Sequence, residues 1–166
     1  MKSRLFPPLA LILIPLSCLA AGCRYEIRDG GFWVHNGTAY FNCPLFGTHE
    51  PSMLLSGDRP AFAYIDSTSA GKFGTLYIGV VTKRGGKWLD HFTETDSFYE
   101  PGLTRHVVED PDVMTGSLEV TAVPLSPGEG FIIGLRWIKP PVERVRLVWA
   151  FWGGFRVYRK LQFPDR

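Results

Sequence analysis

The sequence lacks most of the patterns by which enzymes and metal proteins are recognised. It has no Gly-x-Ser-x-Gly nucleophile motif, no Gly-x-x-x-x-Gly-Lys-Ser phosphate loop and no His-Glu-x-x-His zinc motif. Only 3 cysteines occur, and no two of them have Cys-x-x-Cys spacing, which argues against a zinc site. We therefore expect neither a cofactor nor a bound metal.

The chain also lacks an excess of charge of one sign. It carries 18 Lys and Arg residues against 16 Asp and Glu residues. A nucleic-acid-binding domain needs a net positive surface, so no nucleic-acid partner is expected. The charges are segregated, with acids concentrated in residues 87–130 and bases from residue 136 onward. We expect these two segments to pair as neighbouring strands; the alternative is a patch for an anionic ligand.

A long apolar run occurs only at the N-terminus. Lys2 and Arg4 precede an apolar run over residues 5–19, and small residues follow up to Cys23. This order is typical of a secretory signal. The run contains three prolines and is shorter than the ~20 residues of a spanning helix. The expected organisation is a signal peptide over residues 1–22 and one domain over residues 23–166.

The end of the signal, Leu19-Ala20-Ala21-Gly22-Cys23, resembles a bacterial lipobox. The resemblance implies that Cys23 receives a diacylglyceryl thioether and anchors the exported protein in a membrane of the cell envelope. Such an anchor holds because each buried methylene contributes ~0.8 kcal/mol. The alternative is ordinary cleavage near Ala20 or Gly22. In that case Cys23 and Cys43 are able to form a disulfide in an oxidising compartment.

Short segments of alternating apolar and polar residues make up the rest of the chain. Clusters of Gly, Pro, Asp or Ser separate most of them, and no segment has an apolar stripe at helical spacing. The expected strands are residues 32–35, 38–41, 52–55, 61–65, 75–82, 87–91, 104–108, 117–123, 130–138, 145–152 and 156–161. The sequence therefore predicts an all-β fold, an antiparallel β-sandwich of roughly ten strands.

Two strand arrangements are expected from local patterns. Asn36-Gly37 is a strong signal for a type I′ turn, whose two central residues need positive φ, so residues 32–35 and 38–41 are predicted to form a hairpin. Residues 76–81 and 147–152 are apolar on both faces. Both are therefore predicted to be central strands that are covered on both sides.

Carboxylates and aromatic residues are the remaining chemical resources. Asp90, His91, Glu94 and Asp96 crowd one segment, which matches no calcium loop and is expected to be a solvated turn. A glycosidase needs two carboxylates about 5 to 10 Å apart. The sequence offers the following candidates but nothing that pairs them: Asp58, Asp66, Glu94 and Glu100.

Among the 5 tryptophans, Trp149 and Trp152 are expected on opposite faces of one strand. Most aromatic residues of a sandwich belong to its core, which is the expectation for each of them. The alternative is that one of the two is a stacking platform for the apolar face of a sugar ring.

Residues 41–66 form a polar segment with many Pro and Gly residues, so most of it is expected to be an ordered crossing loop. Arg59 is predicted to pair with Asp58 or Asp66. The polar groups of the segment either cap the sheet edges or line a ligand groove. The candidate residues for ligand contact or loop ordering are Asn42, Asp58, Arg59, Asp66, Trp149 and Trp152.

Four short motifs carry a family resemblance: residues 42–47 (NCPLFG), 57–60 (GDRP), 74–79 (GTLYIG) and 151–154 (FWGG). They resemble landmarks of an uncharacterised domain at the N-terminus of large secreted proteins of polysaccharide-degrading bacteria, which are regarded as glycoside hydrolases. The resemblance implies a β-sandwich that precedes an all-helical catalytic barrel. Cys43 departs from the family, which more often has Arg there. The sequence ends at Arg166, so the expected catalytic module is not part of it.

These observations predict an exported accessory β-sandwich domain of a carbohydrate-degrading system, either non-catalytic or glycan-contacting. The expected partners are a polysaccharide or oligosaccharide and, through Cys23, a membrane. One alternative is a small or fragmentary glycoside hydrolase that uses a carboxylate pair. A second alternative is a structural envelope lipoprotein that binds protein, which predicts a sizeable exposed apolar patch.

Overall fold

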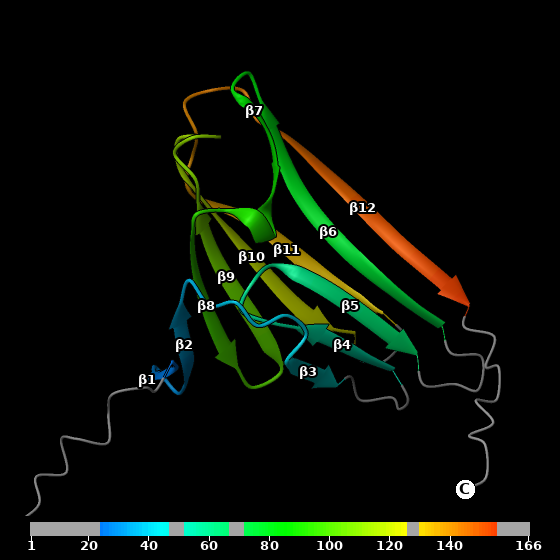
Figure 1. The fold of residues 1–166 in the computed structure, drawn as a ribbon. Coiled ribbons are helices and arrows are strands. Elements are labelled where there is room, and N and C mark those ends of the chain that lie inside the picture. The colour runs from blue at the N-terminus through cyan, green and yellow to red at the C-terminus, as the bar shows by residue number, and fades with distance from the viewer. Residues whose placement is uncertain (1–23, 47–51, 67–71, 126–129, 156–166) are drawn as a thin grey trace, which may run out of the picture.

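The computed structural model describes residues 24–46, 52–66, 72–125 and 130–155, which form two packed antiparallel β-sheets (Figure 1). In spatial order, the first sheet contains β1 (Glu26–Arg28), β2 (Gly31–His35), β8 (Glu94–Glu100), β9 (Leu103–Glu109), β10 (Ser117–Pro124) and β11 (Phe131–Lys139). The second sheet contains β12 (Arg146–Phe155), β6 (Lys72–Thr82), β5 (Ala61–Asp66), β4 (Ser52–Ser56) and β3 (Cys43–Phe46), and β7 (Gly85–Trp88) pairs with β6. The predicted all-β antiparallel sandwich is confirmed, with 12 strands within the described residues.

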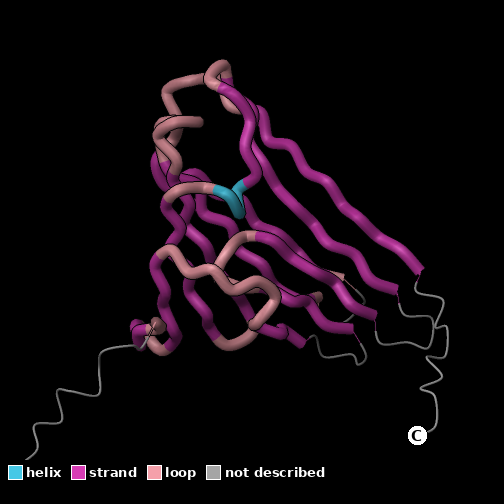
Figure 2. Tube along the Cα trace, viewed as in Figure 1, coloured by secondary structure: helices cyan, strands magenta, loops and turns pink. Residues whose placement is uncertain are grey.

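Strand is almost the only regular structure in the described residues (Figure 2). One 3-10 turn, Leu89–His91, follows β7. Among the residues that the structure describes, none belongs to a helix long and apolar enough to cross a membrane.

The apolar core lies between the inner faces of the two sheets. On β6, Ile78 and Val80 point inward and are buried, while on β10 Leu118 and Val120 do the same from the opposite sheet. This is the burial that the alternation of β10 predicts, since every second residue of a strand faces the same side. Fully burying one such side chain contributes roughly 1.5–3 kcal/mol.

A polar layer also lies in this core and links the two sheets. The Nδ1 atom of His106 on β9 lies 2.8 Å from the Ser97 hydroxyl on β8, and its Nε2 atom lies 3.4 Å from the Ser56 hydroxyl on β4. Thr104 donates to Ser56 over 2.8 Å. All four side chains are buried, so these Ser and His groups are out of reach of any substrate. Burial lowers the pKa of His106 to about 3, so its imidazole is neutral.

The predicted hairpin at Asn36-Gly37 is wrong. β2 pairs with β1 and β8, and residues 37–42 form no strand. Asn36 has a positive φ of 48°, but Gly37 does not lie in the left-handed region that a type I′ turn requires. Asn36 instead extends the pairing with β8, because its backbone N–H donates to the Thr95 carbonyl and its side-chain oxygen accepts from the Thr95 N–H. The chain then crosses to β3 in the other sheet.

The predicted position of residues 147–152 is also wrong. They belong to β12, which lies at the border of the second sheet, where it pairs with β6 (Figure 1). A large side chain is exposed on each face, with Trp149 at 73% and Trp152 at 75%. For residues 76–81 the central position is confirmed, since β6 lies between β5 and β12. The predicted cover on both faces is not complete, because Tyr77 and Val81 are only half-buried.

The predicted pairing of the acidic and basic segments is confirmed at β10 and β11. Arg136 forms two hydrogen bonds of 2.9 Å with Glu119, which is the residue directly opposite in the register. Glu119 is buried, and Arg105 on β9 lies on its other side at 3.9 Å.

Three strands were not expected from the sequence, namely β1, β3 and β8. The segment around Asp90 is not a simple turn either, because it contains the 3-10 turn and then β8. The expected strand 87–91 begins earlier, as β7, and gives way to the 3-10 turn after Trp88. The predicted signal peptide, Cys23 and the expected strand 156–161 lie outside the described residues.

We expect the polar core layer to make stability depend on pH between about 6.5, the ordinary pKa of histidine, and about 3, the pKa of His106 in the folded protein. The pKa of His106 is lowered in the folded protein, so the unfolded chain binds more protons as pH falls below 6.5, and stability decreases with acidification. The slope should approach 1.4 kcal/mol per pH unit, to be measured by urea unfolding. The variant His106→Gln should lose this slope, and a wild-type slope near zero would contradict the assignment.

Candidate functional site

One buried carboxylate organises the end of the sandwich where β1, β2 and β8 face β3. Asp58 is fully buried and follows β4. Its Oδ1 atom accepts hydrogen bonds from the hydroxyls of Tyr25, at 2.9 Å, and Tyr99. Its Oδ2 atom accepts from the Arg24 guanidinium and, at 2.8 Å, from the Ala39 N–H. One carboxylate therefore joins the N-terminal segment, the crossing segment between β2 and β3, and β8.

Two glycines make room for this contact. A Cβ atom on Gly37 would overlap the Asp58 carboxylate, and a Cβ atom on Gly57 would lie 2.6 Å from the Ala39 carbonyl oxygen. Backbone hydrogen bonding supports the same approach, since the Asp58 N–H donates to the Ala39 carbonyl over 2.8 Å. Gly37 is thus required by a close approach of the crossing segment to Asp58 rather than by a hairpin turn.

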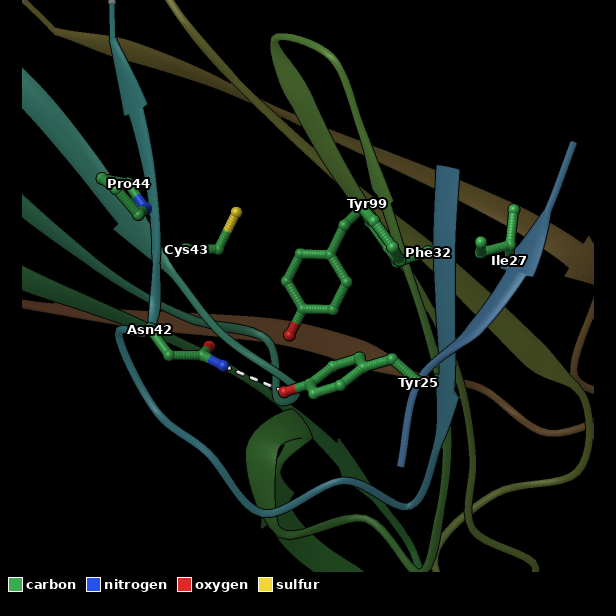
Figure 3. Close-up of a pocket in the computed structure, with 7 residues that line it drawn as sticks. All are labelled: Tyr25, Ile27, Phe32, Asn42, Cys43, Pro44 and Tyr99. Atoms are coloured by element: carbon green, nitrogen blue, oxygen red, sulfur yellow. Dashed lines mark hydrogen bonds between the residues drawn. The ribbon is translucent and has the colours of Figure 1, made fainter. Parts of the chain in front are cut away.

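An open pocket of about 550 Å³ lies beside the Asp58 contacts, between the edges of the two sheets (Figure 3). Its walls come from β2, β8 and the N-terminal segment on one side and from β3 on the other. The lining residues are Tyr25, Ile27, Phe32, Asn42, Cys43, Pro44 and Tyr99. Pockets of this size with mostly apolar walls and a few placed polar groups are typical of small-molecule sites.

The polar corner of the pocket is formed by Asn42 and the two tyrosines. The Asn42 side-chain amide donates to the Tyr25 hydroxyl over 3.0 Å, and the rings of Tyr25 and Tyr99 meet edge to face with centroids 5.8 Å apart (Figure 3). Burial, and after it the neighbouring Tyr25, raises the pKa of Tyr99. Tyr99 therefore remains a protonated hydrogen-bond donor to Asp58 at physiological pH.

Arg59 orders the crossing segment, but its predicted pairing with Asp58 is wrong. Its guanidinium donates to the Gly37 carbonyl at 2.8 Å, the Phe92 carbonyl at 2.7 Å and the Thr95 hydroxyl at 3.0 Å. The side chain of Asp66, the other predicted partner, lies outside the described residues. Arg59 thus holds the crossing segment by donating hydrogen bonds to uncharged acceptors, whereas Asp58 holds it by accepting hydrogen bonds with a charged carboxylate.

The structure brings Asn42 and Asp58 together at the pocket and leaves the two tryptophans apart from it. Trp149 and Trp152 lie on β12, opposite Ile78 and Thr75 of β6, and therefore on opposite faces, as predicted. The expectation that both belong to the core is wrong, because both are exposed.

Cys43 contributes a half-buried thiol to the pocket, and burial raises its pKa, which makes it a weak nucleophile. Its possible disulfide partner Cys23 lies outside the described residues, so that disulfide stays a prediction. Lipidation of Cys23 stays a prediction for the same reason.

The acidic residues around the 3-10 turn are used in local structure. Asp90 is buried, and Tyr40 directs its hydroxyl toward it at 3.4 Å. Glu94 and Asp96 on β8 both contact His35, at 3.3 and 2.8 Å. Within the described residues, no group of three or more His, Cys, Asp or Glu side chains is arranged to hold a metal ion.

Sequence reasoning missed Arg24, Tyr25 and Tyr99 as parts of the site. A usable signal was the alternation in residues 24–28 (RYEIR), where Tyr25 and Ile27 alternate with charged residues as in a short strand. Tyr99 belongs to β8, whose inward residues Thr95 and Ser97 are polar and therefore hide the strand from an apolar pattern.

Comparisons with protein-family models, with curated proteins and with solved structures found no match for this chain.

We expect Asp58→Asn to lower the free energy of unfolding by about 3–5 kcal/mol. The substitution removes the negative charge that pairs with Arg24, and it replaces one carboxylate oxygen, which accepts two hydrogen bonds, by an NH2 group that cannot accept any. Chemical denaturation measures the change. The control is Asp96→Asn, whose carboxylate pairs with His35 at the surface and should contribute less than about 1 kcal/mol. Equal effects of the two substitutions would contradict the role given to Asp58.

Proposed function

We propose that this chain is an exported accessory β-sandwich domain of a carbohydrate-degrading system, anchored through Cys23, which contacts a glycan without cleaving it. The observation that carries the proposal is the composition of the pocket beside Asp58. Three aromatic rings, from Tyr25, Phe32 and Tyr99, and the amide of Asn42 surround one open cavity.

This combination suits a pyranose ring, which has an apolar face and a rim of hydroxyl groups. The aromatic walls offer surfaces on which the apolar face can stack. The Tyr25 and Tyr99 hydroxyls already donate to Asp58, and the Tyr25 oxygen also accepts from the Asn42 amide, so the Tyr99 oxygen and the Asn42 carbonyl are left to accept hydrogen bonds from sugar hydroxyls. Because Asp58 holds both tyrosines, the rings are oriented before a ligand arrives, which lowers the entropy lost on binding.

The state of Asp58, the carboxylate beside the pocket, supports a purely binding role. A carboxylate has about four lone-pair sites, and Asp58 accepts hydrogen bonds from Tyr25, Tyr99, Arg24 and Ala39 while fully buried. It is therefore unsuited to act as a general acid, a general base or a nucleophile. The proposal assigns cleavage to a separate catalytic module, as the resemblance of residues 42–47 and 57–60 to the accessory domain implies.

Calorimetric titration of the purified protein with plant and host polysaccharides tests the proposal. At least one glycan should bind, and Phe32→Ala and Asn42→Ala should each weaken binding by about tenfold or more, equivalent to ~1.4 kcal/mol. Both side chains line the pocket, and Phe32 is more than half exposed, so the fold should tolerate its removal.

The matched control is Phe46→Ala, which removes an exposed ring on β3 that does not line the pocket and should leave binding unchanged. If the folded protein bound none of the glycans, the proposed function would be wrong. If Trp152→Ala abolished binding while Phe32→Ala did not, the glycan site would lie on β12 instead.

A further inference from the structure

β12 is a long edge strand without the usual protection. It spans 10 residues and pairs with β6 along its whole length, from Arg146 opposite Val81 to Phe155 opposite Lys72. No other strand of the described residues pairs with its second side. Natural edge strands are commonly blunted by proline, lysine or a bulge, and residues 147–153 (LVWAFWG) contain neither proline nor charge. The edge is therefore suited to pairing with another strand.

One face of β12 continues the inner face of the sandwich. Leu147, Trp149 and Phe151 lie opposite Val80, Ile78 and Leu76 of β6, and directly opposed residues share a face. Val80 and Ile78 are 1% and 4% exposed, whereas Leu147, Trp149 and Phe151 are 45%, 73% and 49% exposed. The row of apolar side chains on the inner face of β6 therefore continues onto β12, where the side chains are exposed.

We propose that this edge pairs with the same edge of a second copy of the chain. The two β12 strands run antiparallel about a twofold axis at Ala150, so that the second sheets of the two copies become one continuous sheet. A twofold interface uses the same surface on both subunits, which requires that the strand be complementary to itself.

The register at Ala150 meets this requirement. It places Trp149 opposite Phe151 of the partner subunit, and by symmetry the reverse, which forms two aromatic cross-strand pairs on the inner face. On the outer face, Trp152 lies opposite Val148 of the partner subunit. An axis at Phe151 would leave Trp149 opposite a glycine, and an axis at Trp149 would place Arg146 opposite Trp152.

Charge favours the antiparallel direction. Arg144 and Arg146 lie at one end of β12, and with Lys83 they line a surface cavity of about 400 Å³. In the antiparallel pair the two Arg146 residues are separated by roughly 27 Å along the strands, several Debye lengths at physiological salt. Parallel pairing would bring the two basic clusters side by side.

Sedimentation equilibrium of the purified protein tests the dimer. The wild-type protein should show a monomer–dimer equilibrium, and Trp149→Asp should raise the dimer dissociation constant by at least about tenfold, because it places a charge in the centre of the paired strands. Trp149 is mostly exposed in one copy, so its substitution should leave the fold intact. The matched control is Ile132→Asp on the outer face of β11, which is also exposed and should have no effect.

A cross-linking experiment tests the register. Directly opposed residues have Cβ atoms about 4.5–5.5 Å apart, close enough for a disulfide after a small adjustment. Ala150→Cys should therefore form a covalent dimer on mild oxidation, and Ile132→Cys should not. The proposal would be overturned if the protein stayed monomeric at all concentrations tested, whatever covers the edge of β12 in the monomer. A dimer that Trp149→Asp does not weaken, or equal cross-linking of the two cysteine variants, would overturn it too.

Discussion

The buried carboxylate of Asp58 is the contact on which this end of the sandwich depends. An ionised group that is removed from water is strongly unfavourable unless hydrogen bonds replace its hydration, and here four donors from three separate segments replace it. Arg24 and Tyr25 precede β1, Ala39 lies in the crossing segment and Tyr99 lies on β8. The first strand, the crossing between the sheets and the pocket wall are therefore held by one side chain.

The polar core extends this arrangement into the centre of the molecule. The Asp58 backbone carbonyl accepts from the Ser97 hydroxyl over 2.7 Å, and Ser97 contacts His106, which contacts Ser56 of the opposite sheet. Such buried networks specify one packing of the sheets, because any other packing leaves their groups without partners. The pocket thus forms at an edge of the sandwich whose walls are fixed from within, which suits a binding site that must keep its shape.

The opposite border of the second sheet has the reverse character. β12 carries large apolar side chains on both faces and pairs on one side within the described residues. Burying this strand against a second copy and binding a ligand in the pocket would use different ends of the molecule. The two proposals are consequently independent, since the pocket residues belong to β1, β2, β3 and β8, to the segment before β1 and to the crossing segment between β2 and β3.

Local sequence patterns predicted the fold class well and the site only in part. Strands such as β10 were predictable because their inward residues are apolar and their outward residues are polar. β8 was not, because Thr95 and Ser97 face the polar core layer. Residues 147–152 were placed wrongly because apolar residues on both faces are the pattern of a fully buried strand, and the pattern does not encode how many neighbouring strands are present. Asn42 and Asp58 stood out in a polar segment, but Tyr25 and Tyr99 reach Asp58 from 33 and 41 residues away, a proximity that no local pattern encodes.

Amide hydrogen exchange at Ala39 and Asp58 is the most direct test of the central role of the Asp58 contact. Both residues lie outside strands, yet the Ala39 N–H donates to the Asp58 carboxylate and the Asp58 N–H donates to the Ala39 carbonyl, each over 2.8 Å. We expect both amides to exchange only through global unfolding, as slowly as the amides of the central strands. Exchange at the rate of an unstructured peptide would show that the crossing segment opens independently, and that Asp58 does not hold this end of the sandwich together.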